Sequence, residues 1–280
     1  MKIGDLKALG LVHYTPVGAV EALLEVIHVL AHLPWWGSIV ATTLLFRLLL
    51  FPIAVKSAQR NARLANLSPI IQKTMEQIKS AHRAKDQQTV AEKTSELQRI
   101  YRANDVHPLK MLGSGLIQAP IFISFFMALR DMCNLPVPGF RDGGIAWFTD
   151  LTMKDPYFVL PLLSSVGFIA IMEYTAHNNN QVNPTMKHVF RGLGVFSFFI
   201  TASLPSAVVL YIATSSFFSM GQFALLNKKF MRHKFKIPDL IKQPTPKMPE
   251  KSFMEQMREL FAEEQQAKEE NNNRRKRRRS

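Results

Sequence analysis

Long runs of apolar residues with almost no charge alternate with strongly basic segments along this chain. The apolar runs are residues 38–55, 112–129, 157–172 and 193–226. Most of the ionic side chains lie instead in residues 56–110 and 227–280. Eighteen residues of α-helix rise about 27 Å, close to the ~30 Å hydrocarbon thickness of a bilayer. This alternation is typical of a protein that crosses a membrane several times, and it argues against a soluble domain.

The last apolar run is too long for one crossing. Residues 193–226 would extend about 51 Å as a single helix, and the Pro205–Ser206 pair interrupts them near the middle. The second span is expected at Met111–Leu129, and the third at Tyr157–Met172, where Glu173 closes it. With the first run and the two halves of the last, the sequence predicts five spans.

Basic residues indicate how these spans are oriented, because loops on the inner side of a membrane carry an excess of Lys and Arg. The 56–110 loop carries eleven and the chain from Lys228 onward sixteen more, whereas the first 37 residues and the 131–156 loop carry two each. We therefore expect the N-terminus outside and the C-terminus inside. The expected domains are an outer-side segment at residues 1–37, a five-span core at residues 38–230 and a basic inner-side tail at residues 231–280. The core includes an inner-side hairpin at residues 56–110.

Four polar residues recur on one face of an otherwise apolar helix expected at Val17–Leu33. They are Glu21, Glu25, His28 and His32. Two carboxylates and two histidines could hold a metal ion. The polar face of a helix that lies in the membrane interface, anchored by Trp35 and Trp36, explains the same spacing more simply. We predict the interfacial helix and no metal site, and the single cysteine, Cys133, excludes an internal disulfide.

The 56–110 loop is expected to fold into a helical hairpin. Ser68 followed by Pro69 has the pattern of a helix start, and Asp86 can cap a second helix. The apolar seam between the two helices is expected at Ile71, Met75 and Ile78, facing Val90, Thr94, Leu97 and Tyr101. So narrow a seam predicts a mobile paddle. An inert connector is the alternative, although connectors are usually shorter.

One arginine stands near the middle of the first run, in the stretch TTLLFRLLLFP at residues 42–52. A charged side chain at that depth costs ~3 kcal/mol on insertion scales, and ionisable residues inside membranes usually mark functional sites. The alternative is a buried helix of a soluble protein whose Arg47 reaches the surface. The other apolar runs argue against it.

Four motifs follow one another along the chain in the order typical of one protein family. They are FRLLLFPIAVKSAQ, PLK followed by IQAPIFISFFMALR, WFTDLTMKDPYFVLP and LPSAVVLY. With them the chain resembles the YidC/Oxa/Alb family of membrane protein insertases over roughly Leu33–Phe230. The phrase LPVPGFRDGGIAWFTDL most resembles the mitochondrial branch of that family.

The resemblance implies an all-α polytopic membrane protein, with five transmembrane helices around a polar groove that is closed on the outer side. An inner-side helical hairpin and an N-terminal interfacial helix complete the expected fold. Arg47 matches the groove arginine of the family, and Gln118 matches a polar groove position. Where many relatives have an asparagine in the fifth span, this chain has Ser216. The hydroxyl side chains expected around Arg47 are Thr43, Ser165, Thr201 and Ser215.

The resemblance also implies a function without covalent chemistry or cofactor. An insertase moves nascent hydrophobic segments and their short polar flanks into the membrane, here co-translationally, and it is not an enzyme. A wet, positively charged groove would lower the cost of moving acidic residues through hydrocarbon. The implied location is the mitochondrial inner membrane, with the N-terminus in the intermembrane space and the C-terminus in the matrix. We further expect that a presequence has been removed from this chain, and that the protein can form homo-oligomers.

Two other functions fit parts of the sequence. An intramembrane hydrolase could use Ser114 as a nucleophile, but no histidine lies inside any expected span to act as a base. A secondary transporter would need inverted repeats and several intramembrane ionisable groups. The five spans hold only Arg47, with Glu173 at an edge. The insertase is preferred, and the transporter is the first alternative.

The chain ends in a dense basic run that suggests a further partner. Its residues are Arg274, Arg275, Lys276, Arg277, Arg278 and Arg279, and Lys228 and Lys229 follow the last span. Such a run resembles a nuclear localisation signal, for which a five-span protein has little use. Anionic lipid attracts each basic residue by ~1 kcal/mol. Ribosomal RNA is the favoured partner, because the mitochondrial branch is implied to hold ribosomes through a basic tail. The expected partners are nascent membrane proteins, the ribosome and anionic lipid.

Overall fold

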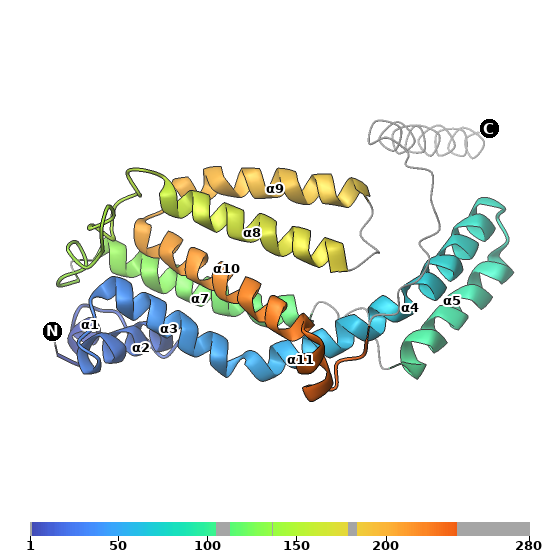
Figure 1. Cartoon of the computed structure of the whole chain (residues 1–280), viewed down its shortest axis with the longest axis horizontal. Coiled ribbons are helices and arrows are strands. Elements are labelled where there is room, and N and C mark those ends of the chain that lie inside the picture. Colours follow the sequence, from blue (N-terminus) through green and yellow to red (C-terminus); the bar gives the residue numbers. More distant parts are fainter. Residues whose placement is uncertain (1, 105–112, 136, 179–183, 240–280) are drawn as a thin grey trace, which may run out of the picture.

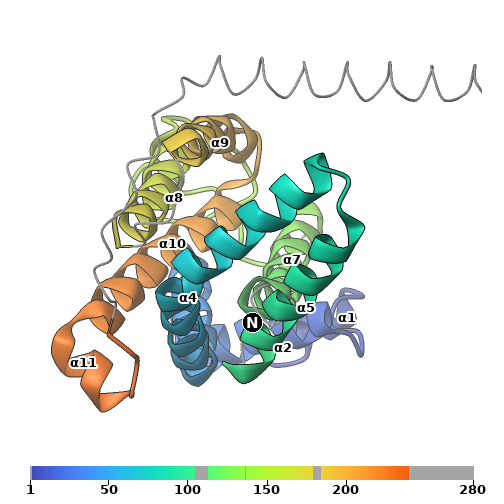
Figure 2. The same ribbon diagram turned by 90° about the vertical axis from the view of Figure 1, so that its right-hand side faces the viewer.

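The structure is a computed structural model of the chain, and it describes residues 2–104, 113–135, 137–178 and 184–239 (Figure 1). Regular secondary structure in these residues is α-helical, as predicted. The helices that lie side by side along the long axis are α3 (Trp35–Leu49), α7 (Gly113–Asn134), α8 (Val159–Asn178), α9 (Pro184–Ala202) and α10 (Ser206–Asn227). Helix α10 is central: it packs against α3, α7 and α8, while α9 packs on α8. Figure 2 shows the same layers end-on.

Separate elements cover the two ends of these helices. At one end, α4 (Phe51–Arg83) and α5 (Gln87–Ala103) form an antiparallel hairpin that projects beyond the other helices (Figure 1). At the other end lie α1 (Asp5–Ala8), α2 (Pro16–Leu30) and the loop that precedes α8. The short helix α11 (Lys229–Lys234) follows α10. The molecule therefore has an open hairpin end and a covered end.

Helix length and hydropathy support fewer crossings than the sequence predicted. Within the described residues, α10 alone is long and apolar enough to cross a bilayer unaided. Helix α3 with α4 gives a second crossing if the pair counts as one span bent by 53°. Val159–Tyr174 and His188–Ala202 are apolar but shorter. A helix overlaps each of the predicted spans, and a five-span core stays a prediction.

The first predicted span is broken. Helix α3 ends at Leu49 and α4 begins at Phe51, so the prediction of one continuous helix over residues 38–55 is wrong. Pro52 is the physical reason. A proline inside a helix lacks an N–H and clashes with the carbonyl four residues earlier, whereas in the first turn of a new helix it is well tolerated. The chain therefore bends at Leu50.

The predicted helix start at Ser68–Pro69 is wrong as well. Helix α4 runs through both residues for its whole length of 33 residues. Pro69 removes one backbone hydrogen bond, at a cost of ~3 kcal/mol, but residues 62–67 before it contain neither Gly nor Pro and favour the helix. Ser68 is buried and accepts a hydrogen bond of 3.2 Å from Gln72 Nε2. Its side chain therefore does not cap a helix end.

The second helix of the hairpin begins where the sequence predicts. Asp86 is the N-cap residue of α5, and its Oδ1 accepts a hydrogen bond of 3.1 Å from the Thr89 backbone N–H. A capping carboxylate satisfies one of the backbone donors that a helix N-terminus leaves free. The predicted cap is confirmed.

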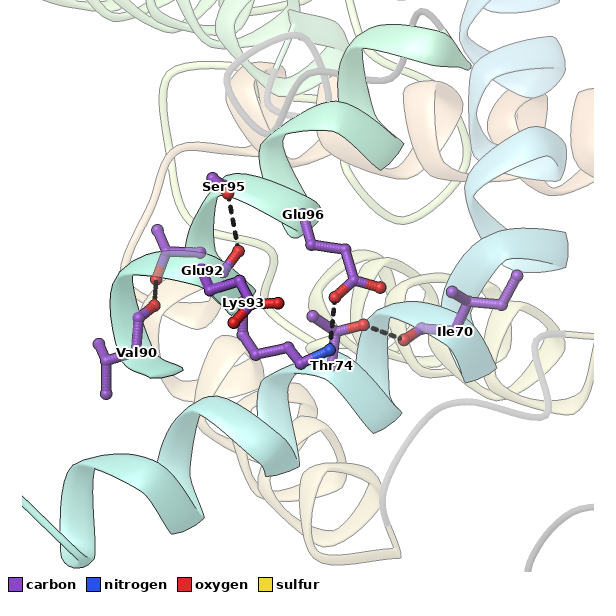
Figure 3. Close-up of polar contacts among 8 residues, drawn as sticks. Ile70, Thr74, Val90, Glu92, Lys93, Ser95 and Glu96 are labelled. Atoms are coloured by element: carbon purple, nitrogen blue, oxygen red, sulfur yellow. Dashed lines mark hydrogen bonds and ion pairs between the residues drawn. The ribbon is translucent and has the colours of Figure 1, made fainter. Parts of the chain in front are cut away.

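The seam between α4 and α5 (Figure 3) agrees with the predicted one in part, because Met75 and Thr94 are exposed and the other predicted residues are half-buried, namely Ile71, Ile78, Val90, Leu97 and Tyr101. Thr74 is buried in it, with its hydroxyl donating to the Ile70 carbonyl, whereas Met75 is 43% exposed. Beside Thr74, Lys93 of α5 pairs with Glu96 at 2.7 Å. Helix α5 has no buried residue along its described length. Because little apolar area is buried, few interactions hold the hairpin closed.

Helix α8 continues past the predicted end of the third span. Glu173 lies inside α8, where it forms an ion pair with Arg191 of α9. A charge that has a partner of opposite sign does not force a helix to end. The predicted break at Pro205–Ser206 is present, because α9 ends before it and α10 begins at it.

The acidic residues of α2 are buried, which contradicts the prediction of an interfacial polar face. Glu21 is 2% exposed and Glu25 is 3% exposed. Glu21 Oε2 accepts the backbone N–H of Val12, and Glu25 Oε1 accepts that of Leu6, both at 2.8 Å. The N-terminal chain thus lies over α2, and its backbone donors replace water around the two carboxylates.

Trp35 joins three elements at the covered end and is not an interfacial anchor. It is 1% exposed. Its ring stacks on His28 of α2 at a centroid distance of 4.0 Å and meets Phe140, in the loop that precedes α8, edge-on at 5.4 Å. Its Nε1 donates to the Pro138 carbonyl at 3.0 Å. A large side chain with this many partners is a core residue.

The buried Glu21 predicts a pH dependence of stability. Burial raises the pKa of this carboxyl above its ordinary 4.5, with a further upward contribution from Asp131, and the hydrogen bond from Val12 opposes the shift. The fold therefore favours protonated Glu21. Its stabilising contribution is complete below pH ~4.5 and is lost as the pH rises through the folded-state pKa. We expect Glu21→Gln to lose less thermal stability than wild type between pH 5 and pH 8 in detergent. Identical pH profiles would contradict this assignment.

Candidate functional site

Arg47 stands in the last turn of α3 and links two other helices. Its Nη1 donates to Gln118 Oε1 of α7 at 3.3 Å, and its Nη2 donates to Ser215 Oγ of α10. The three residues are far apart in the sequence, so the packing of α3, α7 and α10 brings them together. The planar guanidinium of Arg47 carries five N–H donors that point in different directions. It can therefore bond to two helices at once, which the compact ammonium of a lysine would do less well.

A polar hollow opens beside Arg47, with an empty volume of about 380 Å³, part of it open to solvent. Its lining residues are Arg47, Leu50, Ile53, Ala54, Ser57, Gln118 and Gln222. The bend at Leu50 contributes directly, because the lining includes the end of α3, the bend itself and the first turns of α4. The broken helix thus shapes one wall of the site.

Gln222 is a residue of this site that the sequence prediction missed. Its Nε2 is buried, and together with Thr42 Oγ1 it is a buried side-chain polar atom for which the described residues offer no hydrogen-bond partner. The spacing of Ser215, Ser219 and Gln222 along α10 was a usable signal, because residues at i, i+4 and i+7 share one helix face. An amide donor without a partner suits a carbonyl or carboxylate that enters the hollow.

Three of the predicted groove hydroxyls form hydrogen bonds with groups other than Arg47. Thr43 Oγ1 donates to the Ile39 carbonyl at 2.7 Å, and Thr201 Oγ1 donates to the Ser197 carbonyl at 2.9 Å. Ser165 accepts a hydrogen bond of 3.3 Å from Ser197 Oγ, between α8 and α9. These hydroxyls bond within a helix or between packed helices, as Ser and Thr commonly do in membranes. The structure therefore brings Gln118 and Ser215 to Arg47, but not these three.

The chemistry of the hollow is that of a donor-rich site with apolar walls. Its polar groups are a guanidinium, two amides and the Ser57 hydroxyl, which itself accepts a hydrogen bond of 3.3 Å from Arg60 Nη2. Such a site attracts anionic or carbonyl groups without reacting with them. Within the described residues, no group of three or more His, Cys, Asp or Glu side chains is placed to hold a metal ion.

The predicted basic surface is only partly within the described residues. Lys228 and Lys229 are exposed just after α10. The tail cluster Arg274–Arg279 lies outside the described residues, and so do the PLK motif and the side chain of Ser114.

Comparison with known proteins identifies the family. Residues 26–234 match the family model described as "60Kd inner membrane protein". The chain is 41% identical to mitochondrial inner membrane protein OXA1L of Mus musculus over 243 residues, which cover 86% of this chain and 56% of that relative. It is 37% identical to mitochondrial inner membrane protein OXA1 of Saccharomyces cerevisiae over 247 residues, which cover 87% of this chain and 60% of that relative. The chain thus spans less than two thirds of the length of these relatives.

These matches confirm the resemblance that the four motifs indicated. They agree with the predicted location, since the relatives are mitochondrial inner membrane proteins by name. Members of this family are not enzymes. The chain therefore belongs to the 60Kd inner membrane protein family, the YidC/Oxa/Alb family, and to its mitochondrial inner membrane members.

Proposed function

We propose that this protein is an insertase that moves nascent hydrophobic segments, with their short polar flanks, into the mitochondrial inner membrane. The observation that supports the hollow as the path is the position of Arg47, which bridges α7 and α10 beside it. An acidic flank crossing hydrocarbon unaided costs ~3 kcal/mol per charge. A fixed cation and amide donors beside the path would offset part of that cost.

The proposed arrangement has five crossings, an outer-side N-terminal segment and an inner-side hairpin and tail. The uneven distribution of Lys and Arg supports this orientation. In it, the covered end with Trp35 faces the intermembrane space and the hairpin end faces the matrix. The hollow, near the bend at Leu50, then lies toward the matrix, the side from which a nascent chain arrives.

Insertion into liposomes tests the proposed function. The purified protein is reconstituted, and two single-span substrates are added that differ only in an acidic or a neutral translocated flank of equal length. We expect the protein to raise insertion of both, and to raise insertion of the acidic one more. Protein-containing liposomes that insert no more substrate than empty liposomes would refute the function.

Gln222 is expected to serve binding at the expense of stability. Replacing it by methionine, which has a similar shape, removes a buried donor without a partner and should raise the free energy of unfolding by about 1 kcal/mol. The same change should lower insertion several-fold. Gln118→Met is the matched control, because it removes the acceptor of Arg47 and should lower stability. The free energy of unfolding of both variants is measured in detergent. If Gln222→Met and Gln118→Met change it by the same amount and in the same direction, Gln222 does not serve binding at the expense of stability.

The tail is proposed to bind ribosomes through phosphate contacts. We expect deletion of Lys268–Ser280 to weaken association while leaving the fold intact. Each neutralised phosphate releases counterions, so binding should fall by orders of magnitude between ~50 and ~200 mM salt if six or more phosphates are engaged. Co-sedimentation of detergent-solubilised protein with purified ribosomes, without anionic lipid, measures this. Unchanged co-sedimentation after deletion would move the role to Lys228, Lys229 or the hairpin.

A further inference from the structure

The chain after α10 turns back and lies against the beginning of α4. We call Lys228–Asp239 the clasp; it contains α11 and the turn after it, and Figure 1 shows α11 beside the first part of α4. Two side chains of α4 donate to clasp carbonyls: Gln59 Nε2 to Phe235 O at 2.7 Å, and Asn66 Nδ2 to Asp239 O at 2.8 Å. The clasp is therefore tied to α4 at two points about two turns apart.

Apolar packing adds to these two hydrogen bonds. The Phe235 ring meets Phe51 edge-on at a centroid distance of 5.6 Å, directly after the bend between α3 and α4. The buried members of the cluster that joins the clasp to α4 and α10 are Val55, Ala62, Leu226 and Ile237. The clasp thus links the end of α10 to the start of α4 through a small core of its own.

Arg232 closes the clasp on itself. It is 8% exposed, and its guanidinium donates to Asn227 Oδ1 at 3.3 Å and to the Pro238 carbonyl. Its Nε also lies 3.6 Å from the carboxylate of Asp239, which is largely exposed and adds little. One buried side chain therefore joins the end of α10 to the last residues of the clasp. Without Arg232, the last residues of the clasp would lose their main polar link to α11.

The clasp and the hollow use neighbouring residues of the same two helices. On α4, Ile53, Ala54 and Ser57 line the hollow, while Val55 packs against the clasp. On α10, Gln222 lines the hollow, and Leu226, one turn later, packs against the clasp. A shift of the first turns of α4 relative to α10 would therefore change the shape of the hollow and the packing of the clasp at the same time. The bend at Leu50 is the point at which α4 can pivot, since Pro52, two residues later, has no N–H with which to continue the helix hydrogen bonds of α3.

We propose that the clasp is a conformational latch that sets the width of the hollow. When it is closed, it holds the first turns of α4 beside α10. When it is released, α4 pivots at Leu50 and the hollow opens to water. The rest of the basic tail, residues 240–280, follows the clasp directly in the sequence, so a load on these residues acts on the latch before it acts on α10. This inference concerns the shape of the hollow and does not depend on insertase activity.

Cysteine labelling of the full chain in lipid nanodiscs tests the latch. Cys133 is replaced by serine to remove the native thiol, and Ser57→Cys reports access of a polar maleimide to the hollow. Arg232→Ala should raise the labelling rate of this cysteine at least fivefold and should speed tryptic cleavage at Lys234 and Lys236. Arg63→Ala is the matched control, because it removes an exposed arginine from α4 that is not among the residues lining the hollow.

A second release variant protects the test against a folding defect. Gln59→Ala removes one hydrogen bond to the clasp and leaves Arg232 in place, so it should raise labelling in the same direction by a smaller factor. Faster cleavage with unchanged labelling would show that the clasp opens without moving α4, which overturns the proposal. Unchanged cleavage and unchanged labelling in both variants would overturn it as well. Slower labelling would reverse the assigned direction and refute it.

Discussion

Replacing Arg47 by alanine is expected to lower insertion of substrates with acidic translocated flanks at least tenfold, and to affect substrates with neutral flanks much less. Two unit charges 4 Å apart attract each other by ~4 kcal/mol at an effective dielectric constant of 20. A tenfold loss requires only ~1.4 kcal/mol of this. The measurement is insertion into liposomes at equal protein content, with both substrates.

Arg47→Lys separates the charge of Arg47 from its geometry. The guanidinium bonds Gln118 and Ser215 on two helices at once, whereas an ammonium on a flexible stem is a point charge. If attraction of acidic flanks is what matters, Arg47→Lys should keep part of the activity. Loss of insertion in both variants would indicate that the bridge between α7 and α10 is required instead.

A control must remove a cation that lies away from the hollow. Arg141→Ala suits this purpose, because Arg141 is exposed in the loop that precedes α8 and its loss changes the net charge by the same amount. We expect normal insertion. If Arg47→Ala also inserts acidic flanks normally, Arg47 has only a structural role.

Trp35→Ala is expected to lower the free energy of unfolding by ~3–5 kcal/mol, the usual range for removing a fully buried large aromatic side chain. The change removes the stack on His28, the contact with Phe140 and the hydrogen bond to the Pro138 carbonyl. Because these contacts join α2, α3 and the loop that precedes α8, we expect the covered end to loosen first. Unfolding in detergent, with protease sensitivity of the N-terminal residues, measures both effects.

Two variants separate packing from polarity at this position. Trp35→Phe keeps an aromatic ring but leaves the Pro138 carbonyl without its donor, so it should cost ~1–2 kcal/mol. Trp147→Ala removes a tryptophan that is 39% exposed and should cost roughly 1 kcal/mol or less. An equal loss from Trp35→Ala and Trp147→Ala would show that Trp35 does not anchor the covered end.

Several features followed from the sequence alone because their signals are local. The helical class follows from long apolar runs of spanning length. The break at Pro205–Ser206 and the cap at Asp86 are set by the conformational limits of proline and by a side chain that reaches its own backbone. The family follows from motifs that are contiguous in the chain. In each case, residues close together in the sequence carry the information.

Proline at two positions shows where local rules are insufficient. Pro52 and Pro69 both follow helix-forming residues, yet the helix breaks before the first and continues through the second. At Pro69, the burial of Ser68 and the continuation of α4 into the hairpin stabilise the helix by more than the lost hydrogen bond costs. At Pro52, the chain must turn from the packed helices into the hairpin. Only the surrounding packing distinguishes the two sites.

The tertiary structure alone decided which polar groups meet. A stripe such as Glu21 and Glu25 has the same spacing whether it faces water or buried backbone, and only the folded N-terminal chain supplies the N–H donors that bury it. Arg47 meets Gln118 and Ser215, across separations of 71 and 168 residues, only when three helices pack. Helical periodicity determines the face of a helix on which a residue lies. The partner of that face depends on long-range packing, which no short stretch of sequence contains.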